Sequence, residues 1–126
     1  MKNRSLFILM VLLVAILAGC SYNWVLPEAT VDPNPDGEPV SYSKQIQPIF
    51  TNKCVSCHNT GGTSPDLSTG KSYAQVVPAQ VNLTTPAESG IYTFPAPSTS
   101  VHSWKKYSAN EATLVLIWIQ EGAKNN

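Results

Sequence analysis

Two thiols and an imidazole stand within five consecutive residues of this chain, at Cys54, Cys57 and His58. Cysteines three apart on one helical turn face the same way, so their sulfurs can form thioether bonds to two neighbouring vinyl groups of one porphyrin. The histidine that follows is then carried beneath the ring, with its imidazole toward the iron. This C-x-x-C-H spacing is the attachment signature of c-type haem. The sequence therefore predicts one covalently bound haem c at these three residues.

Two other uses of the same cysteines compete with haem attachment. A redox-active C-x-x-C pair is expected in a strand–helix context of the thioredoxin kind, and the sequence has no β-α-β pattern. A structural zinc site needs four ligands. Cys54, Cys57, His58 and His102 would supply them, but at irregular spacing. Zinc is the main alternative to haem at this motif.

The second axial ligand of such an iron has few candidates. Both methionines lie within the first ten residues, in a segment that is expected to be removed. His102 is the one histidine besides His58, and we predict that both bind the iron. The alternatives are an open or water-bound iron and ligation by Lys105 or Lys106. Two imidazoles would give a lower reduction potential than a histidine–methionine pair, because imidazole stabilises ferric iron better than a thioether does.

The first nineteen residues have the pattern of an export signal. Lys2 and Arg4 precede an apolar run from Leu6 to Ala18, and Leu17-Ala18-Gly19-Cys20 resembles a bacterial lipobox. In that family the signal, here residues 1–19, is cut before the cysteine, and Cys20 is lipidated. Several acyl chains on one residue anchor a protein stably. An uncleaved transmembrane anchor is disfavoured, because the apolar run of about 13 residues is shorter than the roughly 20 that a spanning helix needs.

Residues 20–40 then form the lipidated cysteine and a tether. Four prolines with intervening Asp, Asn and Gly residues block regular helix and sheet over this stretch. Everything after Cys20 is expected outside the cytoplasm, in the bacterial cell envelope, in the periplasm or at the cell surface. Ser21 follows the cysteine in place of an aspartate, which by resemblance to the enteric sorting rule favours the outer membrane.

Residues 41–126 are predicted to form one small all-α domain. Ile46, Ile49 and Phe50 indicate a short amphipathic helix, which Pro48 should kink or confine to a turn or two. A second short helix is expected over 72–77, before a proline, and residues 79–103 are expected to be irregular loop.

The last helix has the clearest sequence signals. Ser108 and Glu111 form a capping box, no helix breaker interrupts the run from Ala112 to Glu121, and Gly122 can end the helix. Its centre, residues 114–119, is apolar on nearly all sides, which is typical of a heavily buried helix. We expect it to pack against the first helix and a flat apolar cofactor.

This domain is similar to the c-type cytochrome domains of bacterial, particularly Bacteroidetes-like, exported lipoproteins. The likeness covers nearly all of residues 41–126 and is carried by residues 43–50 (SKQIQPIF), 54–58 (CVSCH), 65–67 (PDL), 72–73 (SY), 118–119 (WI) and 122–123 (GA). The resemblance implies a small cytochrome c-like fold whose first and last helices cross, with His58 as proximal ligand. Most such domains use a methionine where this chain has His102.

The function expected from these features is electron transfer. The chain would be a membrane-tethered monohaem c-type cytochrome, acting as a one-electron carrier or as the haem subunit of an exported redox complex, with redox proteins as partners and no enzymatic activity. The alternative is a five-coordinate haem that binds a small gas or peroxide, although the single arginine lies in the signal. Lys+Arg and Asp+Glu are balanced at eight each, so no basic surface for nucleic acid is indicated.

Overall fold

The computed structural model describes Arg4 and residues 32–126, and these residues form helices, turns and loops without a β-strand. The all-α prediction is therefore confirmed at the level of secondary structure for this part of the chain. The expected signal peptide, the lipidation site Cys20 and the first part of the tether lie outside the described residues. None of the helices within the described part has the length and apolar character that a membrane crossing needs.

The first helical stretch consists of a π-helical turn, η1 (Tyr42–Ile46), and the α-helix α2 (Gln47–Lys53). The Ser41 side chain caps η1 by accepting the N–H of Lys44. Pro48 lies in the first turn of α2, where its missing N–H would have no partner in the helix and its fixed φ suits helical backbone. The expected short helix is present, and Pro48 helps to begin α2.

The middle of the chain contains more helix than the sequence indicated. The predicted second helix is present as α3 (Ser72–Val76), and Val77 is extended because it precedes a proline. Residues 79–103 were expected to be irregular, but they include η2 (Pro86–Glu88) and α4 (Gly90–Thr93). Pro86 begins η2, because the fixed φ of a proline suits a first helical turn.

The last helix, α5 (Ala109–Gln120), has the caps predicted for it. The Ser108 hydroxyl accepts the N–H of Glu111, and the Glu111 carboxylate accepts the N–H of Ser108 at 2.7 Å. At the other end Gly122 has a φ of 95°. The next N–H, that of Ala123, reaches back to the carbonyl of Trp118 at 2.9 Å, which closes the helix with a Schellman motif. Both ends are thus fixed by local sequence.

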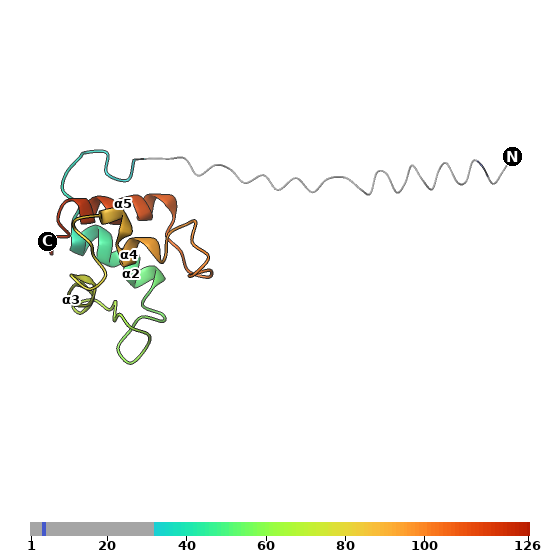
Figure 1. Cartoon of the computed structure of the whole chain (residues 1–126), viewed down its shortest axis with the longest axis horizontal. Helices are drawn as coiled ribbons and strands as arrows, with labels where there is room; N and C mark the ends of the chain where they lie inside the picture. The colour runs from blue at the N-terminus through green and yellow to red at the C-terminus, as the bar shows by residue number, and fades with distance from the viewer. Residues whose placement is uncertain (1–3, 5–31) are drawn as a thin grey trace.

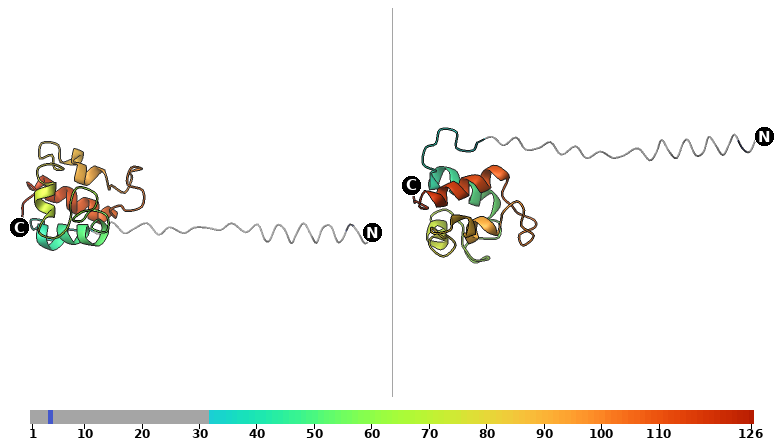
Figure 2. Two further views of the ribbon diagram at one scale, coloured as in Figure 1. Left: turned by 90° about the horizontal axis from the view of Figure 1, so that it is seen from below. Right: turned by 45° about the horizontal axis from the view of Figure 1, so that its top comes forward.

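The core lies where α5 packs against η1 and against α4 (Figures 1 and 2). Trp118 is fully buried, and its ring centre is 5.3 Å from that of Tyr42 on η1. The start of the helical region and the C-terminal segment join the same structure, because Val40 N–H donates to Glu121 at 2.7 Å and Tyr42 N–H to the Asn126 side chain at 2.8 Å. The other buried apolar residues are Val40, Ile46, Ile49, Phe50, Leu67, Val76, Ile91, Tyr107, Ala112, Val115, Ile119 and Ala123.

Candidate cofactor site

The C-x-x-C-H motif forms a single turn that continues from the end of α2. The N–H of Cys54 donates to Phe50 O at 2.8 Å, and the N–H of His58 donates to Cys54 O at 2.9 Å. Cys54 is half-buried and Cys57 is exposed. Burial, followed by the nearby Glu111 carboxylate, raises the pKa of the Cys54 thiol to about 11. Cys54 is therefore a protonated thiol at neutral pH.

The ring of His58 is oriented by a backbone carbonyl. Its Nδ1 lies 3.2 Å from the carbonyl oxygen of Pro65. Because a carbonyl oxygen can only accept, Nδ1 carries the proton in this contact and Nε2 keeps its lone pair. This is the tautomer that binds a metal through Nε2.

The loop that carries Pro65 is tied to the core. The N–H of Leu67 donates to His58 O at 2.8 Å, and the Leu67 side chain is buried. The carbonyl of Leu67 accepts from Gln47 on α2 at 3.2 Å. The carbonyl that orients His58 thus belongs to a segment held between the motif and α2.

The same loop is closed on its outer side by Asp66. Its carboxylate accepts the Thr60 hydroxyl at 2.7 Å and the Ser68 N–H at 3.0 Å, and it lies 3.5 Å from the Lys71 ammonium. The hydrogen bonds from Ser68 and Thr60, with a smaller contribution from Lys71, lower the pKa of Asp66 to about 2. The loop is therefore closed by an ionised carboxylate at neutral pH.

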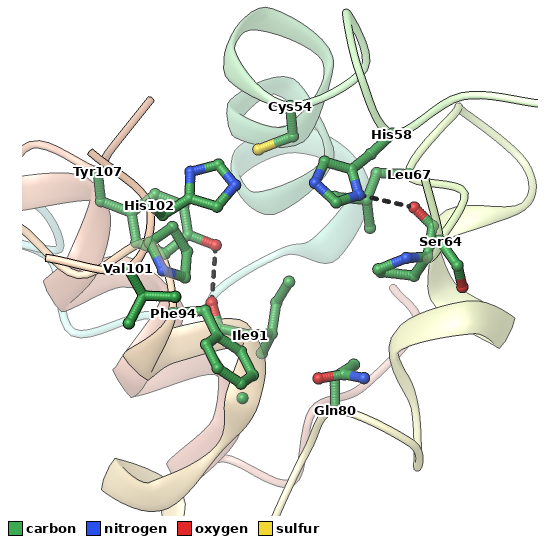
Figure 3. A pocket seen from close by; sticks show the side chains of 13 residues that line it. Cys54, His58, Ser64, Leu67, Gln80, Ile91, Phe94, Val101, His102 and Tyr107 are labelled. Carbon is green, nitrogen blue, oxygen red and sulfur yellow. Dashed lines mark hydrogen bonds between the residues drawn. The ribbon is translucent and has the colours of Figure 1, made fainter. Parts of the chain in front are cut away.

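His102 faces His58 from the opposite side of the site, on the segment between α4 and α5. The two ring centres are 6.0 Å apart and the ring planes are inclined by 25°, and Figure 3 shows the rings pointing toward one another. The Nδ1 of His102 lies 2.6 Å from the carbonyl oxygen of Lys105. As at His58, Nδ1 donates and Nε2 is left with its lone pair. Residues far apart in sequence are brought together here.

Two cavities adjoin this pair of histidines. The inner cavity contains about 730 Å³ of empty space, part of it open to solvent. The outer cavity encloses about 690 Å³. Cys54, His58 and His102 line both cavities. The other residues of the inner cavity are Ser64, Pro65, Leu67, Gln80, Gly90, Ile91, Phe94, Pro95, Val101 and Tyr107. The two cavities share these three side chains and both have mostly apolar linings, and they are together called the slot.

The lining of the outer cavity also includes Lys53, Cys57, Thr63, Trp104 and Lys105. The Lys53 ammonium lies 2.6 Å from the carboxylate of Glu111 at the start of α5, and it donates to Lys106 O at 3.2 Å. Lys53 therefore connects the end of α2 to the segment that carries His102. The ring of Trp104 is 73% exposed and its centre is 5.7 Å from that of His102.

The donor set suits an iron porphyrin better than a bare ion. An imidazole nitrogen binds a metal at about 2 Å, which puts the ring centre roughly 3 Å from the metal and two opposed ring centres roughly 6 Å apart. The 6.0 Å separation of His58 and His102 fits this value. Haem iron takes only its axial donors from the protein, whereas zinc takes four ligands. Among the described residues, no group of three or more His, Cys, Asp or Glu side chains is placed to hold a metal ion.

The sequence identified the residues with reactive side chains and missed those that support them. Pro65 belongs to the PDL segment (65–67) that carries the family resemblance, but the role of its carbonyl in orienting His58 was not predicted. Tyr107 lines the inner cavity, and its hydroxyl donates to Ile91 O at 2.9 Å (Figure 3). Burial raises the pKa of this tyrosine well above its usual value. Gln80 and Gly90, which lie on the segment expected to be irregular, complete the far wall.

Comparison with known proteins adds no information about this site. No family model, curated protein or solved structure matches the chain. The functional argument therefore rests on the residues and their geometry.

Proposed function

We propose that this chain is a membrane-tethered, monohaem c-type cytochrome with a cytochrome c-like fold, in which His58 and His102 are the axial ligands. It acts as a one-electron carrier or as the haem subunit of an exported redox complex. Lipidated Cys20 anchors it in the bacterial cell envelope, with the outer membrane favoured, and residues 21–40 serve as the tether. Its partners are redox proteins, and it catalyses no reaction of its own.

The observation that carries this proposal is the opposed pair of histidines beside the C-x-x-C turn. Both rings have Nδ1 engaged by a backbone carbonyl and Nε2 available. Both rings line both cavities of the mostly apolar slot, and Cys54 lines both cavities as well. Covalent attachment also suits a small domain, which cannot enclose a large cofactor completely.

When bound, a haem would supply reversible one-electron chemistry at its iron. The chain's own residues would attach the haem, bind its iron and shield it from water. Cys54 and Cys57 would hold the porphyrin by thioether bonds, His58 and His102 would fill both axial positions, and the apolar wall would exclude water from the inner edge. Pro65 O and Lys105 O fix the two rings, so little rearrangement is expected when the charge of the iron changes.

The experiment that tests the proposal is expression of the full chain in a host that attaches haem to exported cytochromes. The intact mass should exceed that of the lipidated polypeptide by one haem, and the denatured protein should keep a haem spectrum. A redox titration should fit one reversible one-electron step. A colourless protein of unmodified polypeptide mass, or one that binds zinc instead, would refute the proposal.

A further inference from the structure

A polar side chain lies at the inner end of the slot, on the turn that follows α3. The N–H of Gln80 donates to Val76 O at 2.8 Å, and its carbonyl accepts from the Ile91 N–H at 3.1 Å. These backbone bonds fix the residue. Its side-chain amide has no hydrogen-bond partner among the described residues, and it lines the inner cavity. Since none of the described buried side-chain polar atoms lacks a partner, this amide is accessible to solvent at the cavity wall.

A glycine makes room for the Gln80 amide. A Cβ atom added at Gly90 would overlap Oε1 of Gln80 and would lie 3.3 Å from the ring of Phe94. With glycine at this position, the amide lies directly against the α4 backbone. Ile91 and Phe94 provide apolar surroundings on that side. The position therefore presents one polar group within an otherwise apolar wall.

Gln80 and Cys54 lie toward opposite ends of this cavity, with the histidine pair nearer to Cys54 (Figure 3). A porphyrin bonded to Cys54 through its vinyl-bearing edge has its two carboxylates at the opposite edge. No Lys, Arg, Asp or Glu lines the inner cavity. The –NH₂ group of Gln80 is a neutral hydrogen-bond donor at the end of the cavity away from Cys54.

Resting on the proposed function, we propose that the Gln80 side chain is a carboxylate-binding group, which donates a hydrogen bond to one haem propionate. The titratable groups that face this cavity are Cys54, His58, His102 and Tyr107. The first three would be bonded to the haem or its iron, and the Tyr107 hydroxyl already donates to Ile91 O. The propionate would then be the group that titrates. Apolar surroundings raise its pKa, and the bond from Gln80 lowers it.

The test is the pH dependence of the midpoint potential in the holoprotein. Reduction adds one negative charge beside the propionate and favours its protonation, so the potential falls with rising pH near the propionate pKa. Gln80→Leu removes the donor at similar volume. We expect the pH range over which the midpoint potential falls to shift to higher pH by about one unit. This shift corresponds to a tenfold gain in the proton affinity of the propionate. Gln75→Leu, at an exposed position on α3, should leave the curve unchanged.

A second variant keeps the amide and moves it. Gly90→Ala should displace the Gln80 side chain and shift the curve in the same direction by a smaller amount. Superimposable curves for wild type and Gln80→Leu would overturn the inference, as would a shift in Ser64→Ala with none in Gln80→Leu. These outcomes require attached haem in every variant. Absence of haem from the wild type would instead refute the proposed function.

Discussion

The two histidines of the site are held by different kinds of structure. His58 follows directly from α2, and the carbonyl that orients it belongs to a loop tied to the core through Leu67. His102 lies on the segment that projects from the helices in Figure 1, and its supporting carbonyl is three residues away in that same segment. The motif side of the site, Cys54 to His58 with the Pro65 loop, is therefore built into the fold. The His102 side, the segment between α4 and α5, is supported mainly by its own backbone.

This difference predicts how the His58 side and the His102 side of the site should respond to substitution. Replacing a group on the motif side should disturb attachment and folding together. Replacing a group on the His102 side should change the chemistry at the iron while leaving the domain folded. Local openings occur most easily in segments with few buried contacts, and Val101 and Trp104 on the His102 segment are 69% and 73% exposed.

The largest effect is expected on the motif side. In Cys54→Ala/Cys57→Ala both thioether bonds are lost, so the intact mass should lack the added haem. On the proposed function, the domain should also lose most of its thermal stability, because so small a domain would depend on a covalently held cofactor. Ser56→Ala, between the two cysteines and exposed, is the matched control and should retain the haem. A double variant with the mass of the attached haem would contradict the assignment.

On the other side, His102→Ala should remove one axial ligand and leave the haem attached. The ferric spectrum should change from low-spin to high-spin, and the reduced protein should bind carbon monoxide in a 1:1 ratio. The domain should stay folded, because His102 is not part of the buried core. A low-spin spectrum in His102→Ala would show that another side chain is the ligand. Lys105→Ala and Lys106→Ala would then identify which one.

A smaller effect is expected where Lys53 joins the two sides. Lys53→Met removes the ion pair with Glu111 and the bond to Lys106 O, while it keeps the aliphatic part of the side chain. We expect a loss of about 1 kcal/mol in the free energy of unfolding, since both groups are partly exposed and screened by solvent. Urea titration measures this loss. Lys44→Met on η1 is the control. An equal loss of unfolding free energy in that variant would show that the contacts of Lys53 with Glu111 and Lys106 are not the cause.

The smallest effect concerns acid stability on the motif side. The pKa of Asp66 is lowered from 3.8 to about 2 in the fold, so its ionised form stabilises the native state. This stabilisation is fully present above the unfolded value and is lost as the pH falls through about 2. The stability advantage of wild type over Asp66→Asn should therefore shrink between about pH 5 and about pH 2. Urea midpoints of both proteins at several pH values measure this change. A stability difference that stays constant with pH would contradict the prediction.

Local signals predicted the parts of the fold that local interactions determine. The capping box at Ser108 and the positive φ of Gly122 follow from short-range backbone chemistry. Val77 was expected to end the second helix, but it is extended because it precedes Pro78. The short helices η2 and α4 were missed because Ser, Thr and Pro in their sequence favour turns. Their presence depends on bonds such as the Ile91 N–H to Gln80 O, which joins residues on separate turns.

The residues of the candidate site likewise include some that local sequence predicted and some that depend on long-range contacts. Cys54, Cys57 and His58 could be named because their spacing alone fixes their relation. His102 was named by elimination, and its approach to His58 could not be calculated from a separation of more than forty residues. The supporting carbonyls and the Gln80 amide carry no motif, because any residue can offer a carbonyl and glutamine is common on surfaces. Only the folded chain brings them to the slot.

The proposal that both histidines bind one haem iron is tested by the absorption spectrum of the unmodified holoprotein in both oxidation states, with and without carbon monoxide. We expect low-spin spectra in both states and no change on adding the gas, because His58 and His102 would occupy both axial positions. A high-spin ferric spectrum, with a reduced form that binds carbon monoxide readily, would contradict it and would favour the five-coordinate, gas- or peroxide-binding alternative.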